Sequence, residues 1–358
     1  MKRKDIINNY REKYPAHFGL NIDFDGCVIE VQVNTRELQE ELADYFKEFI
    51  TVKKADILIT AHECPPQDLG IEYTVKQPDP GKTKIKEEFF DLEDGRIVYK
   101  RLTGMIFVFG NGENAAIGPC LENSNQVINF INNRFIEYML NKGCFLGHAA
   151  GVELDGRGIA LAGFSGMGKS TLALHLMSLG TNFISNDRVM VDKADKGLTF
   201  YGVAKQPRIN PGTALNNPDL HCVLKDSERE KFLTLPPDEL WNLEHKYDAL
   251  IDQCYGENKF HLSAPMNGLV ILNWNREEKT TVINIVNPAD RQDLLPAFMK
   301  STGLFYLPDS DEKQNDPDIA AYTELLSETT IIEICGGVDF ELAANACLDF
   351  LKTGDLNG

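Results

Sequence analysis

The stretch Gly163 to Asp187, GFSGMGKSTLALHLMSLGTNFISND, decides the fold of this chain. Its first eight residues match G-x-x-x-x-G-K-[ST], the pattern of loops that bind nucleotide phosphates. The apolar run 158–162 before the loop predicts a buried strand, and the run 171–179 after it predicts a helix that Gly180 ends. Strand, glycine loop and helix thus stand in the order that the motif requires, which predicts an α/β fold.

The residue types of this loop fit phosphate chemistry. Glycines let the backbone bend tightly and aim its N–H groups at phosphate oxygens, and a helix N-terminus adds partial positive charge. Lys169 is expected to reach the β- and γ-phosphates, and the Ser170 hydroxyl to bind Mg²⁺. For Ser165 and Thr171 we prefer the simpler interpretation, that they are ordinary polar residues of a loop and a helix start. The predicted ATP-binding residues are Gly163, Ser165, Gly166, Met167, Gly168, Lys169, Ser170 and Thr171.

Composition narrows the classes of function. A length of 358 residues indicates two domains, or one core domain with a substantial attachment. The formal net charge of −18 argues against a general nucleic-acid or anionic-membrane partner. No apolar run approaches the length of a membrane span, and the basic N-terminus lacks the apolar core of a secretory signal. The eight scattered cysteines contain no CxxC pair, so we expect reduced thiols in a cytoplasmic protein.

We predict that the chain has two domains, with the boundary between residues 122 and 123. Residues 1–122 are expected to form an α+β domain without a catalytic constellation, and residues 123–358 the phosphate-loop domain. In the first part the patterns predict helices at 1–20 and 35–49, strands at 24–33, 55–60, 84–90, 96–102, 105–109 and 115–119, and a turn at Asn111-Gly112.

The second part begins with a predicted helix at 125–142 and a strand at 145–154 that carries His148. A hairpin is expected at 189–201 through Lys196-Gly197, and an insertion or lid at 215–262. The loop around Arg208 and Lys205 offers cations for phosphate. Further predicted elements are strands at 267–274, 280–286 and 330–335, helices at 293–301, 319–326 and 340–351, and a polar loop at 313–318.

Asp187 stands at the end of the strand predicted at 182–185, eighteen residues past Lys169. A carboxylate at the end of the strand that follows the loop's helix can face the loop. It can then help to hold Mg²⁺ or take a proton from an acceptor hydroxyl. Asp187 is therefore both a candidate metal ligand, together with Ser170, and a candidate catalytic residue.

The segment from His148 through the loop to Asn186-Asp187 resembles bacterial HPr serine kinase/phosphorylase, and more closely the divergent HPr-kinase-related proteins. The family has a histidine on a strand just before its phosphate loop, and His148 lies fifteen residues before Gly163. The family also has adjacent acidic residues after the loop's helix, where this chain has Asn186-Asp187. The resemblance covers residues 143–215 well and the rest weakly.

This resemblance implies a phosphate-loop domain of the HPr kinase/phosphoenolpyruvate carboxykinase type, which uses ATP and Mg²⁺ to phosphorylate a hydroxyl. It places Lys169 and the loop on phosphates, Ser170 on Mg²⁺, Asp187 on Mg²⁺ or as base, and His148 beside the acceptor. HPr kinases form rings, so the resemblance also implies a homo-oligomer. Because Asn186 replaces the first acidic residue, the base is either Asp187 or His148, and the family's later phosphorolysis signature is absent.

The leading prediction is thus a kinase that acts on a serine of a protein or on a small-molecule hydroxyl. A shikimate- or gluconate-type small-molecule kinase is a second hypothesis, although such enzymes begin near the loop strand and carry an arginine-bearing lid. A nucleotide-binding regulatory protein with little catalysis is a third, which Asn186 favours. For His148, a structural histidine on a strand is the alternative to a catalytic one.

Overall fold

The computed structural model describes residues 2–78, 83–110, 112–194, 197–236, 239–240, 243, 245–310 and 316–356. The predicted turn residues Asn111 and Lys196 and the first half of the predicted loop 313–318 lie outside these ranges. The chain divides into two compact units, Met1–Lys142 with Thr302–Asn315, and Gly143–Ser301 with Asp316–Gly358. Within the described residues no helix is both long enough and apolar enough to cross a bilayer.

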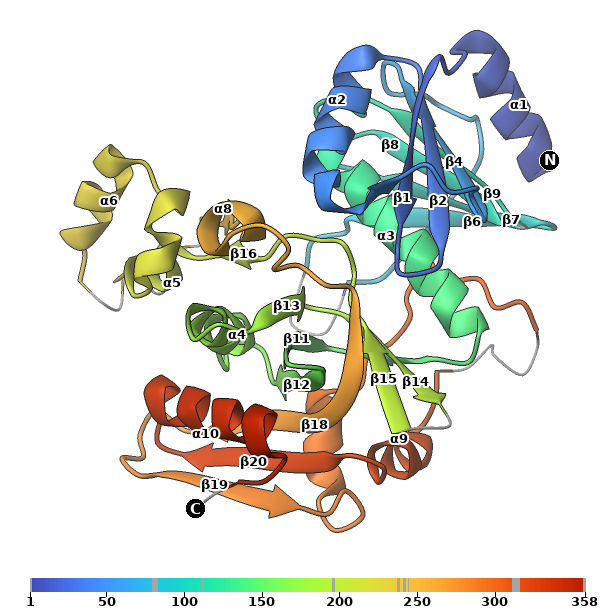
Figure 1. The fold of residues 1–358 in the computed structure, drawn as a ribbon. Coiled ribbons are helices and arrows are strands. Elements are labelled where there is room, and N and C mark those ends of the chain that lie inside the picture. Colours follow the sequence, from blue (N-terminus) through green and yellow to red (C-terminus); the bar gives the residue numbers. More distant parts are fainter. Residues whose placement is uncertain are drawn as a thin grey trace. The chain divides into compact units, whose positions relative to one another are not determined.

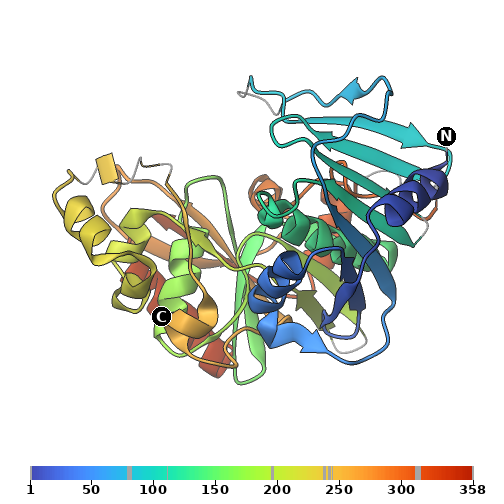
Figure 2. The same cartoon turned by 90° about the horizontal axis from the view of Figure 1, so that it is seen from above.

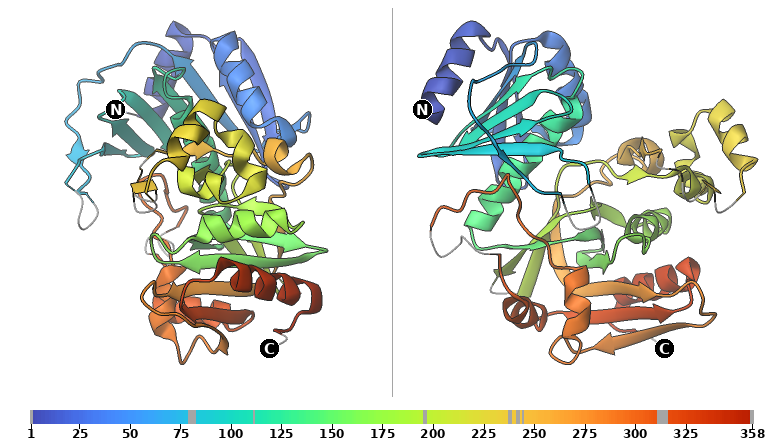
Figure 3. Two further views of the ribbon diagram at one scale, coloured as in Figure 1. Left: turned by 90° about the vertical axis from the view of Figure 1, so that its left-hand side faces the viewer. Right: turned by 180° about the vertical axis from the view of Figure 1, so that it is seen from behind.

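Unit 1 is a mixed sheet with helices on both faces (Figures 1 and 3). Its described strands follow the order β3-β1-β2-β4-β9-β8-β7-β6-β5. The strands are β1 (Phe18–Asp23), β2 (Val28–Val33), β3 (Ile50–Thr51), β4 (Ile57–Glu63), β5 (Thr74–Val75), β6 (Glu87–Leu92), β7 (Gly95–Lys100), β8 (Met105–Gly110) and β9 (Glu113–Gly118). The helices are α1 (Arg3–Lys13), α2 (Arg36–Tyr45), the 3₁₀ turn η1 (Lys47–Phe49) and α3 (Ser124–Asn141).

Alternation along β8 shows how this sheet separates two cores. Ile106 and Val108 pack in the cluster under α1, whereas Phe107 and Phe109 face the α3 side. Side chains alternate across a strand, so one sequence supplies both faces. The predicted strand 24–33 is in fact the turn after β1 followed by the whole of β2. Asp25 and Gly26 turn between β1 and β2 with φ of 55° and 96°.

A short strap, residues 302–310, completes the α3 side of unit 1. The ring of Phe305 lies 5.5 Å from Phe107, 5.6 Å from Phe109 and 6.1 Å from Phe130. Arg134 of α3 is fully buried beside them, with its guanidinium 4.1 Å from the Phe109 ring centre. The guanidinium also donates to the Phe305 carbonyl. The strap is thus part of the core of unit 1, although it is far from it in sequence.

Helix α3 belongs to the same core, because Phe130 and Phe135 pack against aromatic residues of unit 1. The division between the compact units therefore falls after Lys142, whereas the sequence predicted a boundary at 122/123, before this helix. The helical periodicity of residues 125–142 was read correctly, but periodicity does not tell which sheet a helix covers.

Unit 2 is a second mixed sheet, seen from above in Figure 2. Its strand order is β10-β14-β15-β18-β12-β11-β13, with β20 also beside β18 and β19 beside β20. The strands are β10 (Phe145–Gly147), β11 (Ala149–Leu154), β12 (Arg157–Gly163), β13 (Asn182–Ser185), β14 (Val189–Ala194), β15 (Gly197–Tyr201), β18 (Ser263–Trp274), β19 (Thr281–Val286) and β20 (Thr330–Gly336). The two short strands β16 (Arg208–Ile209) and β17 (Tyr247–Asp248) pair separately.

Helices cover both faces of this sheet. Helices α4 (Lys169–Ser178) and α10 (Phe340–Thr353) pack on one face with Ile159, Leu161 and Val270. The 3₁₀ helix η3 (Gln292–Ala297) and α9 (Ile319–Leu326) pack on the other face. The predicted helix at 293–301 is this 3₁₀ segment, which contains Pro296. The remaining described helices, α5 (Pro211–Leu215), η2 (Pro218–Val223), α6 (Asp226–Leu233) and α8 (Ile251–Tyr255), follow β16 or precede β18.

Candidate active site

The glycine loop joins β12 to α4 at the centre of the unit 2 sheet. β12 runs parallel to β18, which in turn runs parallel to β20. Gly166 and Gly168 have φ of 83° and 87°, a left-handed conformation that favours glycine. Gly168 immediately precedes α4, and its carbonyl accepts the N–H of Leu172. The loop therefore ends on a helix N-terminus, as the sequence predicted.

Two aromatic residues hold the loop from outside. The indole N–H of Trp274, the last residue of β18, donates to the Met167 carbonyl over 3.0 Å. The Trp274 ring packs edge-on against Phe340, the first residue of α10, at 4.8 Å. A Cβ atom on Gly168 would lie only 2.5 Å from Cζ of Phe340. Glycine at 168 is thus required by its backbone conformation and by the close approach of this ring.

A pocket of about 800 Å³ opens over the loop. Ser165, Gly166, Gly168, Lys169, Ser170 and Thr171 line it, but Gly163 and Met167 do not. The carbonyl of Gly163 instead accepts Lys169 Nζ at 2.6 Å, and the Met167 side chain packs on the apolar core. Burial lowers the pKa of Lys169, and the charge of Asp187 opposes this shift.

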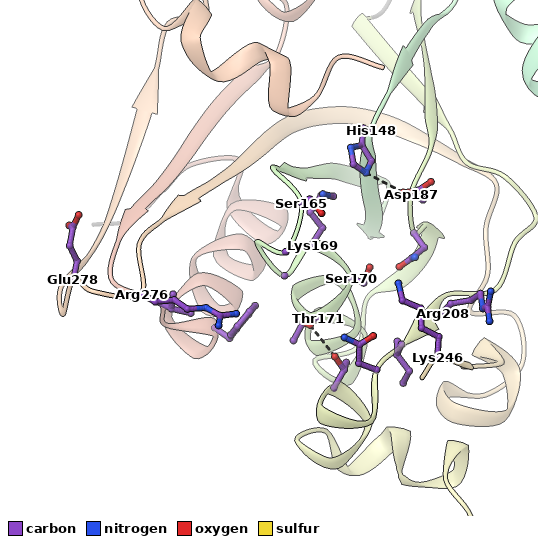
Figure 4. A pocket seen from close by; sticks show the side chains of 18 residues that line it. His148, Ser165, Lys169, Ser170, Thr171, Asp187, Arg208, Lys246, Arg276 and Glu278 are labelled. Carbon is purple, nitrogen blue, oxygen red and sulfur yellow. Dashed lines mark hydrogen bonds and ion pairs between the residues drawn. The ribbon is translucent and has the colours of Figure 1, made fainter. Parts of the chain in front are cut away.

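His148 enters the pocket because the strand that carries it is broken. The sequence predicted one strand over 145–154, but β10 pairs with β14 and β11 pairs with β12. His148 lies between the two strands, where its backbone N–H donates to the Phe298 carbonyl over 2.6 Å. The partner switch turns the imidazole toward Asp187, and its Nε2 lies 3.2 Å from Asp187 Oδ1 (Figure 4).

Asp187 is placed by the turn after β13. Ser185 Oγ donates to the Arg188 carbonyl over 2.5 Å and closes this turn. The Asp187 side chain is 57% exposed, and its other oxygen lies 3.7 Å from Arg188 Nε. The hydrogen bond from His148 lowers the pKa of the Asp187 carboxyl most, and the charges of His148, Arg188 and Lys205 add to this against the effect of burial.

Asn186 lies beside this pair and also lines the pocket. Its side-chain Oδ1 is buried and has no hydrogen-bond partner. A buried amide oxygen without a partner is uncommon in native proteins and marks a position where a donor fits. In the family that the sequence resembles, this position is acidic.

Cations surround the pocket although the chain as a whole is acidic. Lys169, Arg208, Lys246 and Arg276 line it, against the carboxylates of Asp187 and Glu278. Figure 4 shows Arg208 and Lys246 on one side of the helix start and Arg276 on the other. Arg208 Nε lies 3.2 Å from Asp248 Oδ1, across the β16–β17 pair. This local excess of positive charge suits a ligand with several negative charges.

The sequence predicted some of these residues and missed others. His148, Lys169, Ser170 and Asp187, which lie far apart in the chain, line one pocket. Arg208 was named as a candidate for phosphate, and it lines the pocket, whereas Lys205 is not among the lining residues. Sequence analysis did not single out Lys246, Arg276 or Glu278, because each stands in a loop without a motif. Thr171 donates to or accepts from Thr213 at 3.3 Å, in keeping with its reading as a helix-start residue.

One of three comparisons with known proteins, the search of curated sequences, agrees with the predicted resemblance. HPr kinase/phosphorylase of Malacoplasma penetrans is 32% identical over 120 residues, which cover 32% of this chain and 39% of that protein. The match thus spans less than half of the relative's length. The structure of the Hpr(Ser) kinase/phosphatase from Coxiella burnetii is 11% identical, covers 58% of this chain and 92% of that one, and gives a TM-score of 0.31. No protein-family model matches the chain. The sequence match confirms the HPr kinase-like resemblance.

Proposed function

We propose that this chain is an ATP- and Mg²⁺-dependent kinase that transfers the γ-phosphoryl group to a hydroxyl of a protein serine or of a small molecule. One observation carries the proposal: the His148–Asp187 pair lies in the same pocket as Lys169 and Ser170. A phosphate loop alone fits any nucleotide-binding protein, whereas the pair adds the groups that a hydroxyl acceptor needs. The relative named HPr kinase/phosphorylase supports kinase-type chemistry.

ATP is expected to bind with its phosphates over the start of α4. The loop's N–H groups and the helix N-terminus favour negative charge there, and Lys169 supplies a partly buried cation. Arg208, Lys246 and Arg276 add charge around the rim. Phosphate oxygens would replace the Gly163 carbonyl as the partner of Lys169 Nζ, which now lies 2.6 Å from that carbonyl.

The residues of the pocket also fit Mg²⁺. This ion prefers oxygen ligands and is commonly held by one or two carboxylates together with substrate phosphates. The Ser170 hydroxyl and the Asp187 carboxylate are such ligands, and the unpartnered Asn186 Oδ1 can accept a further hydrogen bond beside them. When bound, Mg²⁺ would neutralise charge on the phosphates.

The depressed pKa of Asp187 supports a division of the two catalytic roles between His148 and Asp187. A general base works best when its pKa lies near the working pH, and the pKa of Asp187 is held well below that range. Asp187 therefore suits the anionic roles of binding the metal ion and orienting the imidazole. The imidazole of His148 is then the group that takes the proton from the acceptor hydroxyl.

Transfer of label from γ-labelled ATP tests the proposal directly. The purified chain and Mg²⁺ would be incubated with cell extract that has been separated into protein and metabolite fractions. We expect label in one fraction, and a loss of orders of magnitude with Asp187→Asn or His148→Gln. The exposed residues Asp349 and His17 provide the matched controls Asp349→Asn and His17→Gln, which should transfer label like the wild type.

The same experiment separates the main alternative, a nucleotide-binding regulatory protein. Asn186 favours that alternative, because it halves the acidic charge that the family places after β13. No label in either fraction, together with thermal stabilisation by ATP, would refute the kinase and support regulation. Neither label nor stabilisation would refute both. The acceptor also distinguishes a protein kinase from a shikimate- or gluconate-type enzyme, which would label only the metabolite fraction.

A further inference from the structure

Two thiols meet behind the helix that follows the glycine loop. Cys222 in η2 and Cys254 in α8 have their sulfur atoms 3.3 Å apart. Cys222 is exposed and Cys254 is half-buried. A disulfide bond is about 2.03–2.05 Å long, so a small movement of the side chains would join the two sulfur atoms. The sequence offered no sign of this pair, because the two cysteines are 32 positions apart in the chain.

The elements that carry these cysteines already meet on α4 through hydrogen bonds. Asn217, the N-cap of η2, donates to the Leu174 carbonyl of α4 at 3.3 Å. Tyr255, the residue after Cys254, donates its hydroxyl to the same carbonyl at 3.0 Å. The Asn217 amide and the Tyr255 hydroxyl also lie 3.4 Å apart. Both elements are therefore already joined to α4 by hydrogen bonds, and a disulfide bond would also join them directly to each other.

We propose that Cys222 and Cys254 are a redox modification site, at which a peroxide or a small-molecule disulfide converts the two thiols into a reversible disulfide. With hydrogen peroxide, the exposed Cys222 sulfur attacks one peroxide oxygen and becomes a sulfenic acid, and hydroxide leaves and takes up a proton to become water. The Cys254 sulfur then attacks the Cys222 sulfur, the S–S bond forms, the S–O bond breaks, and the second water leaves. The thiols lose two electrons and two protons, and the peroxide is reduced to two waters.

The protonation state of Cys254 is in keeping with the second role. Burial, and next to it the hydrogen bond and charge of Cys222, raise the pKa of the Cys254 thiol. A protonated thiol is a poor nucleophile, so Cys254 does not compete for the oxidant, and its proton leaves with the departing oxygen when the S–S bond forms. The exposed sulfur of Cys222 is the one that an oxidant in solution can reach.

The bond would restrain one wall of the pocket. Residues Asn210 and Thr213 line the pocket, and α5, which contains Thr213, directly precedes η2. Thr213 also contacts Thr171 at the start of α4. A crosslink that fastens η2 to α8 therefore reduces the freedom of the segment that follows this wall. The modification concerns this segment alone and does not depend on whether the pocket binds a nucleotide.

Mapping of thiols in the full-length protein tests the site. The reduced protein would be treated with hydrogen peroxide, alkylated in denaturant and digested for mass spectrometry. We expect a peptide pair joined through Cys222 and Cys254, a loss of two alkylated thiols, and recovery of both with a reductant. Cys222→Ser and Cys254→Ser should each abolish the link, whereas Cys335→Ser, at another half-buried cysteine, should leave it unchanged.

Three results would overturn the proposal. One is full alkylation of both cysteines after oxidation, and another is a sulfinic acid on Cys222 beside a free Cys254. The third is equal formation of the link in urea, because the folded contact would then contribute nothing. Amide hydrogen exchange supplies a second measurement: oxidation should slow exchange over residues 211–223 and 251–256 by about tenfold or more. Unchanged exchange in a linked sample would refute the restraint on the pocket wall.

Discussion

Replacing a glycine of the loop by alanine should lower the free energy of unfolding by an amount that differs strongly between Gly166 and Gly168. Gly166 and Gly168 have nearly equal φ values, 83° and 87°. An alanine at either position carries the cost of the left-handed conformation, about 1–2 kcal/mol. A Cβ on Gly166 meets nothing within 4 Å, whereas a Cβ on Gly168 lies 2.5 Å from Phe340 Cζ. Overpacking adds about 1–3 kcal/mol, so Gly168→Ala should cost about 2–5 kcal/mol in total.

The fluorescence of Trp274 provides the assay, because its indole contacts both the loop and Phe340. The chain has two tryptophans, so Trp241→Phe leaves Trp274 as the sole reporter. Urea unfolding in this background should show the smaller loss for Gly166→Ala and the larger one for Gly168→Ala. The double variant Gly168→Ala/Phe340→Ala should lose about 1–3 kcal/mol less unfolding free energy than the sum of the losses in the two single variants.

Equal destabilisation by the two alanines would refute this reasoning, since it would show that the Phe340 ring moves aside without cost. A purely additive double variant would refute it in the same way. Loss of ATP binding in Gly166→Ala at unchanged stability would instead locate the effect on the loop's N–H groups rather than on packing.

Three further predictions concern charged groups. Lys169→Ala should remove the thermal stabilisation that Mg-ATP gives, whereas Lys352→Ala, on the exposed side of α10, should retain it; equal stabilisation of both variants would remove the lysine from the site. The folded pKa of Asp187 lies below its unfolded value, mainly through the hydrogen bond from His148, so its stabilising effect is complete above about pH 4 and is lost as the pH falls toward the folded pKa. Asp187→Asn should therefore flatten the fall in unfolding free energy between about pH 4 and pH 2, and a parallel curve would contradict this. Arg134→Met should destabilise unit 1 by about 3–5 kcal/mol in urea, because it leaves the carboxylate of Glu137, whose side chain is 18% exposed, without the cation 2.8 Å away; a loss below about 1 kcal/mol would contradict this.

Local signals in the sequence predicted most elements of both sheets. Thr35 caps α2 by accepting the N–H of Leu38, at the start of the helix predicted at 35–49, and the strand, loop and helix around Lys169 lie where the motif placed them. The errors arose where tertiary contacts decide. The apolar run 145–154 looks like one strand, and only its change of partner from β14 to β12 isolates His148.

The candidate site could be predicted only in part for the same reason. Lys169 and Ser170 follow from a motif with fixed spacing, Asp187 from its place at the end of the strand after the loop's helix, and His148 from the family resemblance. Arg276 and Lys246 come from loops that the fold brings to the pocket, and nothing in their local sequence indicates it. Phe340 was predicted as a helix start, but its contact with Gly168 depends on how α10 packs beside α4.

The strap at residues 302–310 has a consequence for the order in which the protein is made. A ribosome releases the chain from its N-terminus, so the sheet and helices of unit 1 emerge first. Phe305 and the carbonyl that accepts Arg134 follow more than 160 residues after α3, when nearly all of the unit 2 sheet has been synthesised. Until then the aromatic side chains beside α3 lack their last ring. The core of unit 1 is therefore complete only after residues 302–310 have been synthesised, which happens after most of unit 2.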